Sequence, residues 1–188
     1  YEMSASLVGS EMCIRDRTQS AERGENQMKV LAIFTCYNRR ELTRQSMELL
    51  GQNKNVTFDY VIVNDGSTDG TDEMLAAMPY EIDLINGDGG LFWNRGMYEA
   101  IEHAKKAHPD YEYYMLMNDD TKFVPGIFDE MLPLFAPDKV MVGAMCGDDG
   151  RMSYGGIKYV KGIKYKKYGP EAQDICFDTF NACLLYTS

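Results

Sequence analysis

The chain has 188 residues, of which 45% are hydrophobic and 26% charged, as in an ordinary globular domain. This composition excludes a collagen-like, disordered or disulfide-stapled chain, and no apolar run reaches the ~18–20 residues that a membrane span needs. The formal net charge of −10 argues against a nucleic-acid backbone as a partner.

The two ends of the sequence differ in character from its middle. Residues 4–17 and 183–188 resemble translated sequencing-adapter sequence, and residues 18–27 are polar. We therefore expect a non-native or disordered leader over residues 1–27 and a non-native tail over residues 183–188. The folded domain is expected over residues 28–182, beginning at Met28 and incomplete at its carboxyl end.

Short apolar runs in this domain alternate with segments of helical periodicity. The predicted strands are 30–34, 60–63, 82–85, 113–117 and 140–144. The predicted inward residues of the intervening helices are Leu42, Leu49 and Leu50, then Met74, Leu75 and Met78, then Trp93, Met97, Ile101 and Ala104, then Phe128, Met131, Leu132 and Phe135 after a first turn that contains Pro125. Unbroken apolar strands alternating with amphipathic helices predict an α/β fold, a mostly parallel sheet with helices on both faces.

The cysteines and histidines give no metal motif. The five cysteines contain no Cys-x-x-Cys pair, which disfavours a zinc site or a disulfide framework and favours a reducing cytoplasm. His103 and His108 are the only histidines and fall on one predicted helix. We expect both to be exposed side chains rather than ligands.

A polar or glycine-rich cluster follows each of the first four predicted strands. The clusters are 35–39, 64–69, 87–90 and 118–120. Each alone is explained by turn and cap residues, but the carboxyl ends of parallel strands share one edge, where α/β proteins bind ligands. Asp119 and Asp120 repel each other, and a hard divalent cation would relieve that repulsion. The alternative is an Asp-rich turn that caps the next helix.

The sequence lacks two common nucleotide-binding motifs and contains three segments typical of another class of protein. There is no Gly-x-x-x-x-Gly-Lys-Ser/Thr, and no Gly-x-Gly-x-x-Gly follows the first strand, so a P-loop and a dinucleotide-binding domain are both disfavoured. Thr-Cys-Tyr-Asn-Arg at 35–39, Val-Asn-Asp-Gly-Ser-Thr-Asp-Gly at 63–70 and Met-Asn-Asp-Asp at 117–120 instead resemble, in order and spacing, the family 2 glycosyltransferases with the GT-A fold. Three further segments resemble the rhamnosyltransferase-like branch of that family: 87–93, 154–156 and 180–182.

The resemblance implies an inverting transfer of a sugar from a nucleoside diphosphate to an acceptor hydroxyl. The implied acceptor is a saccharide or a lipid-linked saccharide, and the implied setting is bacterial polysaccharide synthesis, in the cytoplasm or at the inner face of the membrane. The resemblance also implies a Mg²⁺ or Mn²⁺ ion that neutralises the leaving diphosphate as a Lewis acid.

Individual roles follow from the same resemblance. Thr35 and Tyr37 match positions that hold the base and ribose, and Asp65 matches a carboxylate that accepts a pyrimidine N–H, which favours a UDP- or dTDP-linked donor. Asp120 matches a direct metal ligand, and Asp119 belongs to the same metal motif and matches a contact to the sugar or ribose. The full set of expected donor-binding residues is Thr35, Tyr37, Asn38, Arg39, Asp65, Gly66, Asp88, Gly89, Asn94 and Asp119.

Two departures from the family pattern leave alternatives open. The family's Arg-Asn-x-Gly segment is matched imperfectly at 94–96 and again at 98–100. The family's carboxylate base lies past a segment like 180–182, so we expect the base beyond residue 182 and the fragment to be inactive. Asp174 and Asp178 are the nearest carboxylates, although a loop role suits them better. The rival functions are a non-catalytic nucleotide-binding remnant and a sugar-phosphate nucleotidyltransferase, whose glycine-rich loop is missing from 35–40.

The Lys- and Tyr-rich segment 158–168 is interpreted as a lysine-protected edge strand in preference to a patch for an anionic acceptor.

Overall fold

The computed structural model describes residues 27–135 and, outside that range, only the short strands named below. The chain divides into two compact units, residues 25–132 and residues 1–24 together with 133–188.

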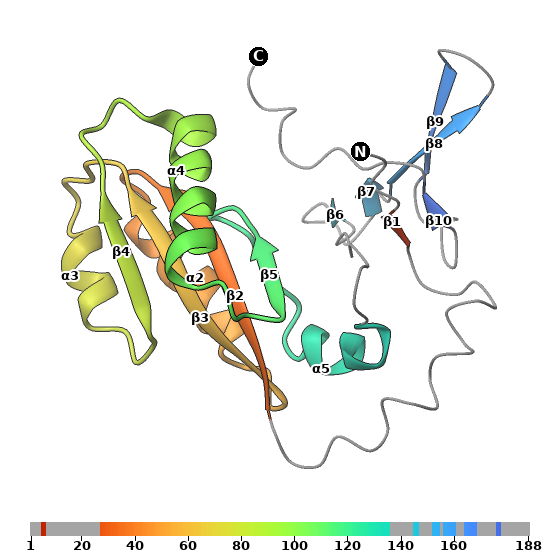
Figure 1. Cartoon of the computed structure of the whole chain (residues 1–188), viewed down its shortest axis with the longest axis horizontal. Coiled ribbons are helices and arrows are strands. Elements are labelled where there is room, and N and C mark those ends of the chain that lie inside the picture. Colours follow the sequence, from red (N-terminus) through yellow and green to blue (C-terminus); the bar gives the residue numbers. More distant parts are fainter. Residues whose placement is uncertain are drawn as a thin grey trace. The chain divides into compact units, whose positions relative to one another are not determined.

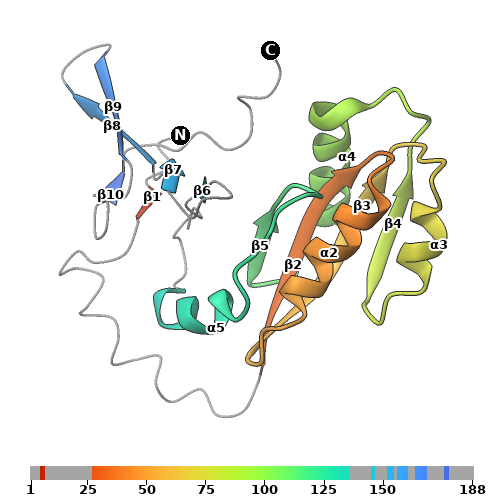
Figure 2. The same cartoon turned by 180° about the vertical axis from the view of Figure 1, so that it is seen from behind.

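The first unit is a four-stranded parallel sheet covered by helices on both faces. In spatial order the strands are β4 (Ile82–Asn86), β3 (Val56–Asn64), β2 (Met28–Cys36) and β5 (Tyr113–Leu116). The helices that link them along the chain are α2 (Arg40–Leu50), α3 (Thr71–Ala76) and α4 (Phe92–Ala107). Figure 1 shows α4 over one face of the sheet, and Figure 2 shows α2 and α3 on the other face. The predicted α/β class, with a parallel sheet between two helical layers, is therefore confirmed.

Two local predictions were wrong, and a third lies outside the described residues. Leu42 is 41% exposed because the inward face of α2 is formed by Thr43, Ser46, Met47 and Leu50. Pro125 precedes α5 (Ile127–Met131) and its N-cap, so it belongs to the preceding turn; the short 3-10 helix η2 (Leu132–Leu134) follows α5. The strand predicted at 140–144 falls on residues that the structure does not describe.

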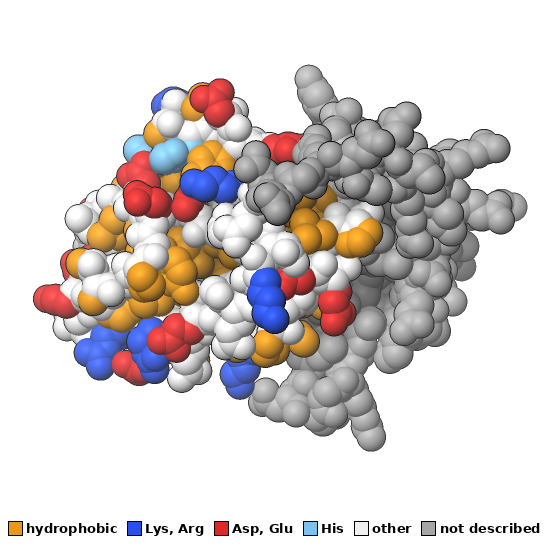
Figure 3. Space-filling model, turned by 90° about the horizontal axis from the view of Figure 1, so that it is seen from below, with side chains coloured by type: hydrophobic (Ala, Val, Ile, Leu, Met, Phe, Trp, Pro, Cys, Tyr) orange, Lys and Arg blue, Asp and Glu red, His pale blue; other side chains and the backbone are white. Residues whose placement is uncertain are grey.

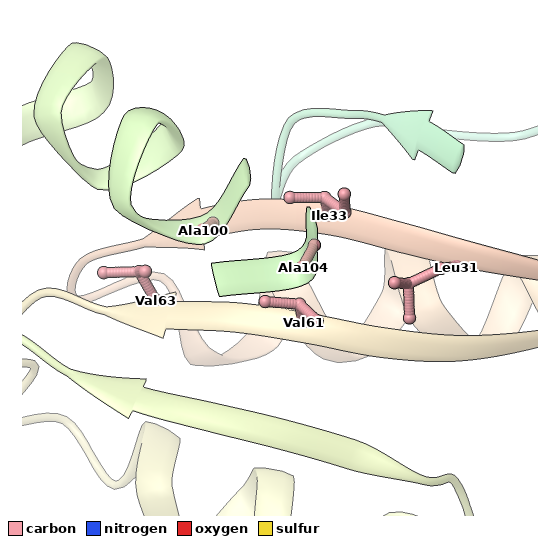
Figure 4. Close-up of a cluster of buried hydrophobic side chains, with 6 residues drawn as sticks. All are labelled: Leu31, Ile33, Val61, Val63, Ala100 and Ala104. Carbon is pink, nitrogen blue, oxygen red and sulfur yellow. The ribbon is translucent and has the colours of Figure 1, made fainter. Parts of the chain in front are cut away.

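The core between the sheet and α4 uses large side chains on the strands and small ones on the helix. Figure 4 shows this cluster, which consists of Leu31, Ile33, Val61, Val63, Ala100 and Ala104. Gly96 lies one helical turn before Ala100, and a Cβ atom built on it would lie 2.5 Å from Oγ1 of Thr35. The absence of a side chain at Gly96 thus lets the first half of α4 lie directly on the end of β2.

The opposite face of the sheet buries larger groups against α2. Phe34 and Tyr60 contact each other edge to face, with ring centroids 6.3 Å apart. Met47 and Leu50 of α2 are fully buried. The two packed faces fix the strands of the sheet and with them the loops that leave its carboxyl edge.

The second unit contains short antiparallel pairs, each described by its backbone. The pairs are β1 (Ala5–Ser6) with β10 (Cys176–Phe177), β6 (Met145–Cys146) with β7 (Met152–Tyr154), and β8 (Gly156–Val160) with β9 (Lys164–Tyr168). The Lys- and Tyr-rich segment therefore forms two paired strands, whereas its predicted lysine-protected edge stays a prediction.

Replacement of Gly96 by alanine tests the close packing of α4 on β2. Gly-to-Ala changes inside an open helix stabilise it by about 1 kcal/mol. Here the new methyl group would overlap Thr35, so we expect the free energy of unfolding to fall by about 1–3 kcal/mol, measured by chemical denaturation. A stabilised Gly96→Ala variant would contradict this packing.

Candidate active site at the carboxyl edge of the sheet

Asp65 is the buried carboxylate that organises this edge. It follows β3 directly and is 3% exposed. Its Oδ1 accepts the backbone N–H of Gly89 at 2.9 Å, and its Oδ2 accepts those of Leu91 and Phe92, both at 3.0 Å. Leu91 and Phe92 are the N-cap and first residue of α4, so the negative charge also lies at the positive end of that helix.

Close backbone contact at Gly66 explains the glycines around Asp65. Gly66 has a φ of +70°, and a Cβ atom there would lie 2.8 Å from the backbone nitrogen of Gly89. The segments 64–66 and 87–89 can therefore lie side by side only with glycine at this position. The predicted site residues Asp65, Gly66 and Gly89 are thus brought together.

Hydrogen bonds join the loop after β2 to the loop after β3. The backbone N–H of Asn38 donates to Oγ of Ser67 at 2.9 Å. The side-chain Oδ1 of Asn38 accepts the backbone N–H of Thr68 at 2.7 Å. Oδ2 of Asp69 accepts the backbone N–H of Arg40 at 2.9 Å, while its Oδ1 accepts the N–H and hydroxyl of Thr71. These contacts fix the backbone on both sides of Arg39.

The three residues that end β2 and begin this loop have different surroundings. Thr35 is buried, and its hydroxyl donates to the backbone oxygen of Val63 at 3.1 Å. Burial, followed by the charge of Asp119, raises the pKa of the Cys36 thiol to about 12, which excludes this cysteine as a nucleophile near neutral pH. Tyr37 is exposed, with its ring edge near Gly89. Tyr37 therefore offers an accessible ring, whereas Thr35 supports the edge from within.

Arg39 bridges the two carboxylates that follow β5. Its Nη1 donates to Oδ2 of Asp120 at 2.8 Å and to Oδ1 of Asp119 at 3.3 Å. Asp119 is buried, whereas the side chain of Asp120 is 41% exposed. Two adjacent carboxylates thus converge on one cationic nitrogen at the edge of the sheet.

Burial dominates the electrostatics of Asp119. It raises the pKa of this carboxyl to about 6, and the charge of Asp120 adds to that effect, while Arg39 opposes it. At neutral pH the edge therefore holds a buried negative charge, which is offset chiefly by the charge of Arg39.

Asp88 and Asn94 are exposed at the same edge and hydrogen-bond to neither Asp119 nor Asp120. Oδ1 of Asp88 accepts the backbone N–H of Gly90 at 3.0 Å, as in a local Asx turn. Asn94 lies in the first turn of α4. Trp93 was predicted to face inward and is half-buried. Its Nε1 donates to Oδ1 of Asn118 at 3.1 Å, which links α4 to the segment after β5.

The sequence also matches the model of a known protein family. The model for glycosyl transferase family 2 matches residues 32–185, which include every strand of the parallel sheet from β3 onward and most of β2. The chain belongs to glycosyl transferase family 2. A mannosyltransferase from Pyrobaculum calidifontis, PcManGT, solved in complex with GDP-Man and Mn²⁺, is structurally similar at 15% identity and a TM-score of 0.43. The match covers 65% of this chain and 37% of that protein, and no curated protein matches the sequence.

The described part of this family 2 chain contains two hollows away from the carboxylate pair. One of about 470 Å³ is lined by Arg40, Glu41, Arg44, Gly70, Glu73 and Met74, next to the contact between Arg40 and Asp69. A larger one of about 1180 Å³ is bordered by Lys29, Phe58 and Tyr80, among others, near the amino ends of β2 and β3. None of the helices in the described part of the chain is long and apolar enough to cross a membrane.

The two histidines were predicted to be exposed, and the structure shows them only partly exposed. His103 and His108 are half-buried, and the Nε2 atom of each lies within hydrogen-bond distance of Oδ2 of Asp83. His108 is the residue after α4 and not part of it. The sequence did hold a signal for this cluster, since Asp83 interrupts an apolar strand and the histidines are five residues apart.

Replacement of Asp65 by asparagine tests the organising role of its carboxylate. The amide group presents N–H donors to backbone N–H donors, so at least one buried hydrogen bond must be lost. We expect the free energy of unfolding to fall by about 1–3 kcal/mol. Asp88→Asn is the matched control, because Asp88 is exposed and accepts one local N–H. Equal effects of the two changes in chemical denaturation would refute the role of Asp65.

The raised pKa of Asp119 predicts a pH-dependent effect of Asp119→Asn in the absence of metal. The pKa of Asp119 is about 6 in the folded state against an ordinary 3.8. The protonated carboxyl therefore stabilises the fold below pH 3.8, and this stabilisation is lost as the pH rises through 6. The free energy of unfolding of the variant should therefore rise, relative to that of the wild type, by on the order of 2 kcal/mol between pH 4 and pH 7. Denaturation curves in EDTA measure this difference, and a gap that does not change with pH would count against it.

Proposed function

We propose that the chain is the nucleotide-sugar-binding part of an inverting glycosyltransferase that uses a UDP- or dTDP-linked donor and a Mg²⁺ or Mn²⁺ ion. The observation that carries the proposal is the convergence of Asp119 and Asp120 on one cation at the carboxyl edge of a family 2 sheet. The saccharide or lipid-linked acceptor, the rhamnosyltransferase-like branch and a role in bacterial polysaccharide synthesis rest on the sequence resemblance.

The carboxylate pair suits a hard divalent ion. Oδ1 of Asp119 and Oδ2 of Asp120 both reach the same nitrogen, so their positions already favour a shared positive charge. Mg²⁺ and Mn²⁺ bind carboxylate oxygens and are normally held by one or two of them together with substrate phosphates. When bound there, the ion would supply Lewis-acid stabilisation of the diphosphate leaving group.

Arg39 is proposed to change partners when a donor binds. Its side chain is half exposed, and among the described residues only Asp119 and Asp120 bond to its guanidinium. Once those carboxylates face another cation, the guanidinium is available to pair with the diphosphate. The backbone N–H groups of residues 89–92 are already taken by Asp65 and Asp88, so the loop before α4 offers the diphosphate little charge.

Tyr37 and Asp65 are proposed to recognise the base. The exposed ring of Tyr37 gives a surface for stacking beside Gly89. Oδ1 of Asp65 accepts one backbone N–H, which leaves a lone pair for a pyrimidine N–H. Deprotonation of the acceptor hydroxyl requires a carboxylate base, which we assign to none of the described residues.

Thermal unfolding of the full chain with a panel of nucleotides tests the proposal. We expect UDP or dTDP with Mn²⁺ to raise Tm, by about 5–10 °C at 100 times the dissociation constant. Asp120→Asn should lose the metal-dependent part of the shift. Arg39→Met should weaken nucleotide binding but not abolish binding of Mn²⁺ alone, since the carboxylates remain.

Asp110→Asn is the matched control, because Asp110 is exposed in the turn after α4 and away from the carboxylate pair. A shift of the same size without Mn²⁺ would contradict the metal site. A preference for GDP or ADP would overturn the pyrimidine assignment. A cooperative transition that no nucleotide moves would refute donor binding altogether.

A further inference from the structure

A second group of ligand-type side chains lies at the other end of α4. Asp83 is the second residue of β4, His103 lies in the last turns of α4, and His108 follows that helix. The Nε2 atoms of His103 and His108 lie 2.7 Å and 2.9 Å from the same oxygen, Oδ2 of Asp83. One ligand atom from each of the three residues falls within 4.8 Å of the other two, the one such group of three among the residues that the structure describes.

The hydrogen bonds of this group show what an ion would replace. An ionised carboxylate only accepts hydrogen bonds, so each imidazole that bonds to it carries a proton on Nε2. A metal ion placed among the three atoms would take the place of those two protons, so each ring would carry its one remaining proton on Nδ1 and any second proton would pass to solvent. The ion would then face two ring nitrogens and one carboxylate oxygen. We propose that Asp83, His103 and His108 form a binding site for one Zn²⁺-like transition-metal ion.

The main chain and neighbouring rings hold the three ligands in place. Asp83 pairs in register with Val61 of the central strand β3. The ring of His108 contacts that of Tyr111 at a centroid distance of 5.9 Å. The backbone oxygen of His108 accepts the hydroxyl of Tyr114 at 2.6 Å. The three side chains thus come from fixed elements, which limits the ordering cost of binding an ion.

The group is also open to solvent. The histidine side chains are 39% and 28% exposed. Figure 3 shows the chain's two histidines at the surface beside acidic side chains. An ion can therefore enter without local unfolding, and three protein ligands leave a position for water.

The ligand types set the expected selectivity. Two imidazoles with one carboxylate suit Zn²⁺, Co²⁺ and Ni²⁺, whereas Mg²⁺ prefers oxygen ligands alone. This group therefore differs in chemistry from the Asp119–Asp120 pair, and the inference stands independently of the proposed function. A bound ion would tie the carboxyl end of α4 to β4.

Proton NMR of the histidine rings in the full chain tests the site directly. With only two histidines, their ring C–H signals can be assigned from the His103→Gln variant. Titration of EDTA-treated protein with ZnCl₂ should shift or broaden both signals together, with saturation at one equivalent. MgCl₂ at the same concentrations should leave both unchanged.

Variants identify the third ligand and separate the two sites. Asp83→Asn should weaken the response of both rings by roughly tenfold or more, while Asp120→Asn should leave it intact. Zn²⁺ that binds without moving the ring signals would indicate the cysteines and overturn the proposal. A response from one ring alone, or an undiminished response in Asp83→Asn, would overturn it as well. The wild-type titration decides even where a variant fails to fold.

Discussion

The arrangement of the site depends on the buried carboxylate of Asp65. An unpaired carboxylate at this depth would cost several kcal/mol, so the chain must supply donors, and it supplies the backbone N–H groups of Gly89, Leu91 and Phe92. That requirement explains the backbone of Phe92, which has a φ of +54° although its side chain is bulky. Because its N–H is directed at Asp65, the phenyl ring lies outward and is 79% exposed. The strained residue is a consequence of satisfying the buried charge.

The same edge combines a fixed backbone with one adaptable side chain. Asn38 and Arg40 are each hydrogen-bonded through their backbone to the loop after β3, so the main chain at Arg39 has little freedom. Within the part of the chain that the structure describes, the guanidinium of Arg39 bonds only to the two carboxylates after β5. A charge change at those carboxylates can therefore redirect the arginine without moving a strand or a helix, and a preorganised loop lowers the entropy lost when a ligand binds.

The sheet and the meeting of the polar clusters at one of its edges could be predicted from the sequence, because both follow from local pattern and one topological rule. Apolar runs alternating with helical segments indicated parallel strands, and parallel strands bring their carboxyl ends to one edge. The partners across that edge could not be predicted: Arg39 meets Asp120 across 81 positions of sequence. The inward face of α2 was misjudged at Leu42 because buried Thr43 and Ser46 carry part of that face, and the histidine cluster was missed because Asp83 lies on a different element.

Helix α4 runs between the two groups of site residues in the first unit. Its 16 residues span about 24 Å, with Asp65 at the amino end and Asp83 with two histidines near the carboxyl end. Between them, Gly96, Ala100 and Ala104 hold the helix against β2 and β3 without room for a shift. A helix fixed at three levels can serve as a rigid reference against which the side chain of Arg39 moves. Adaptation to a donor would then fall on the side chain of Arg39, while the start of α4 keeps the position that Asp65 imposes.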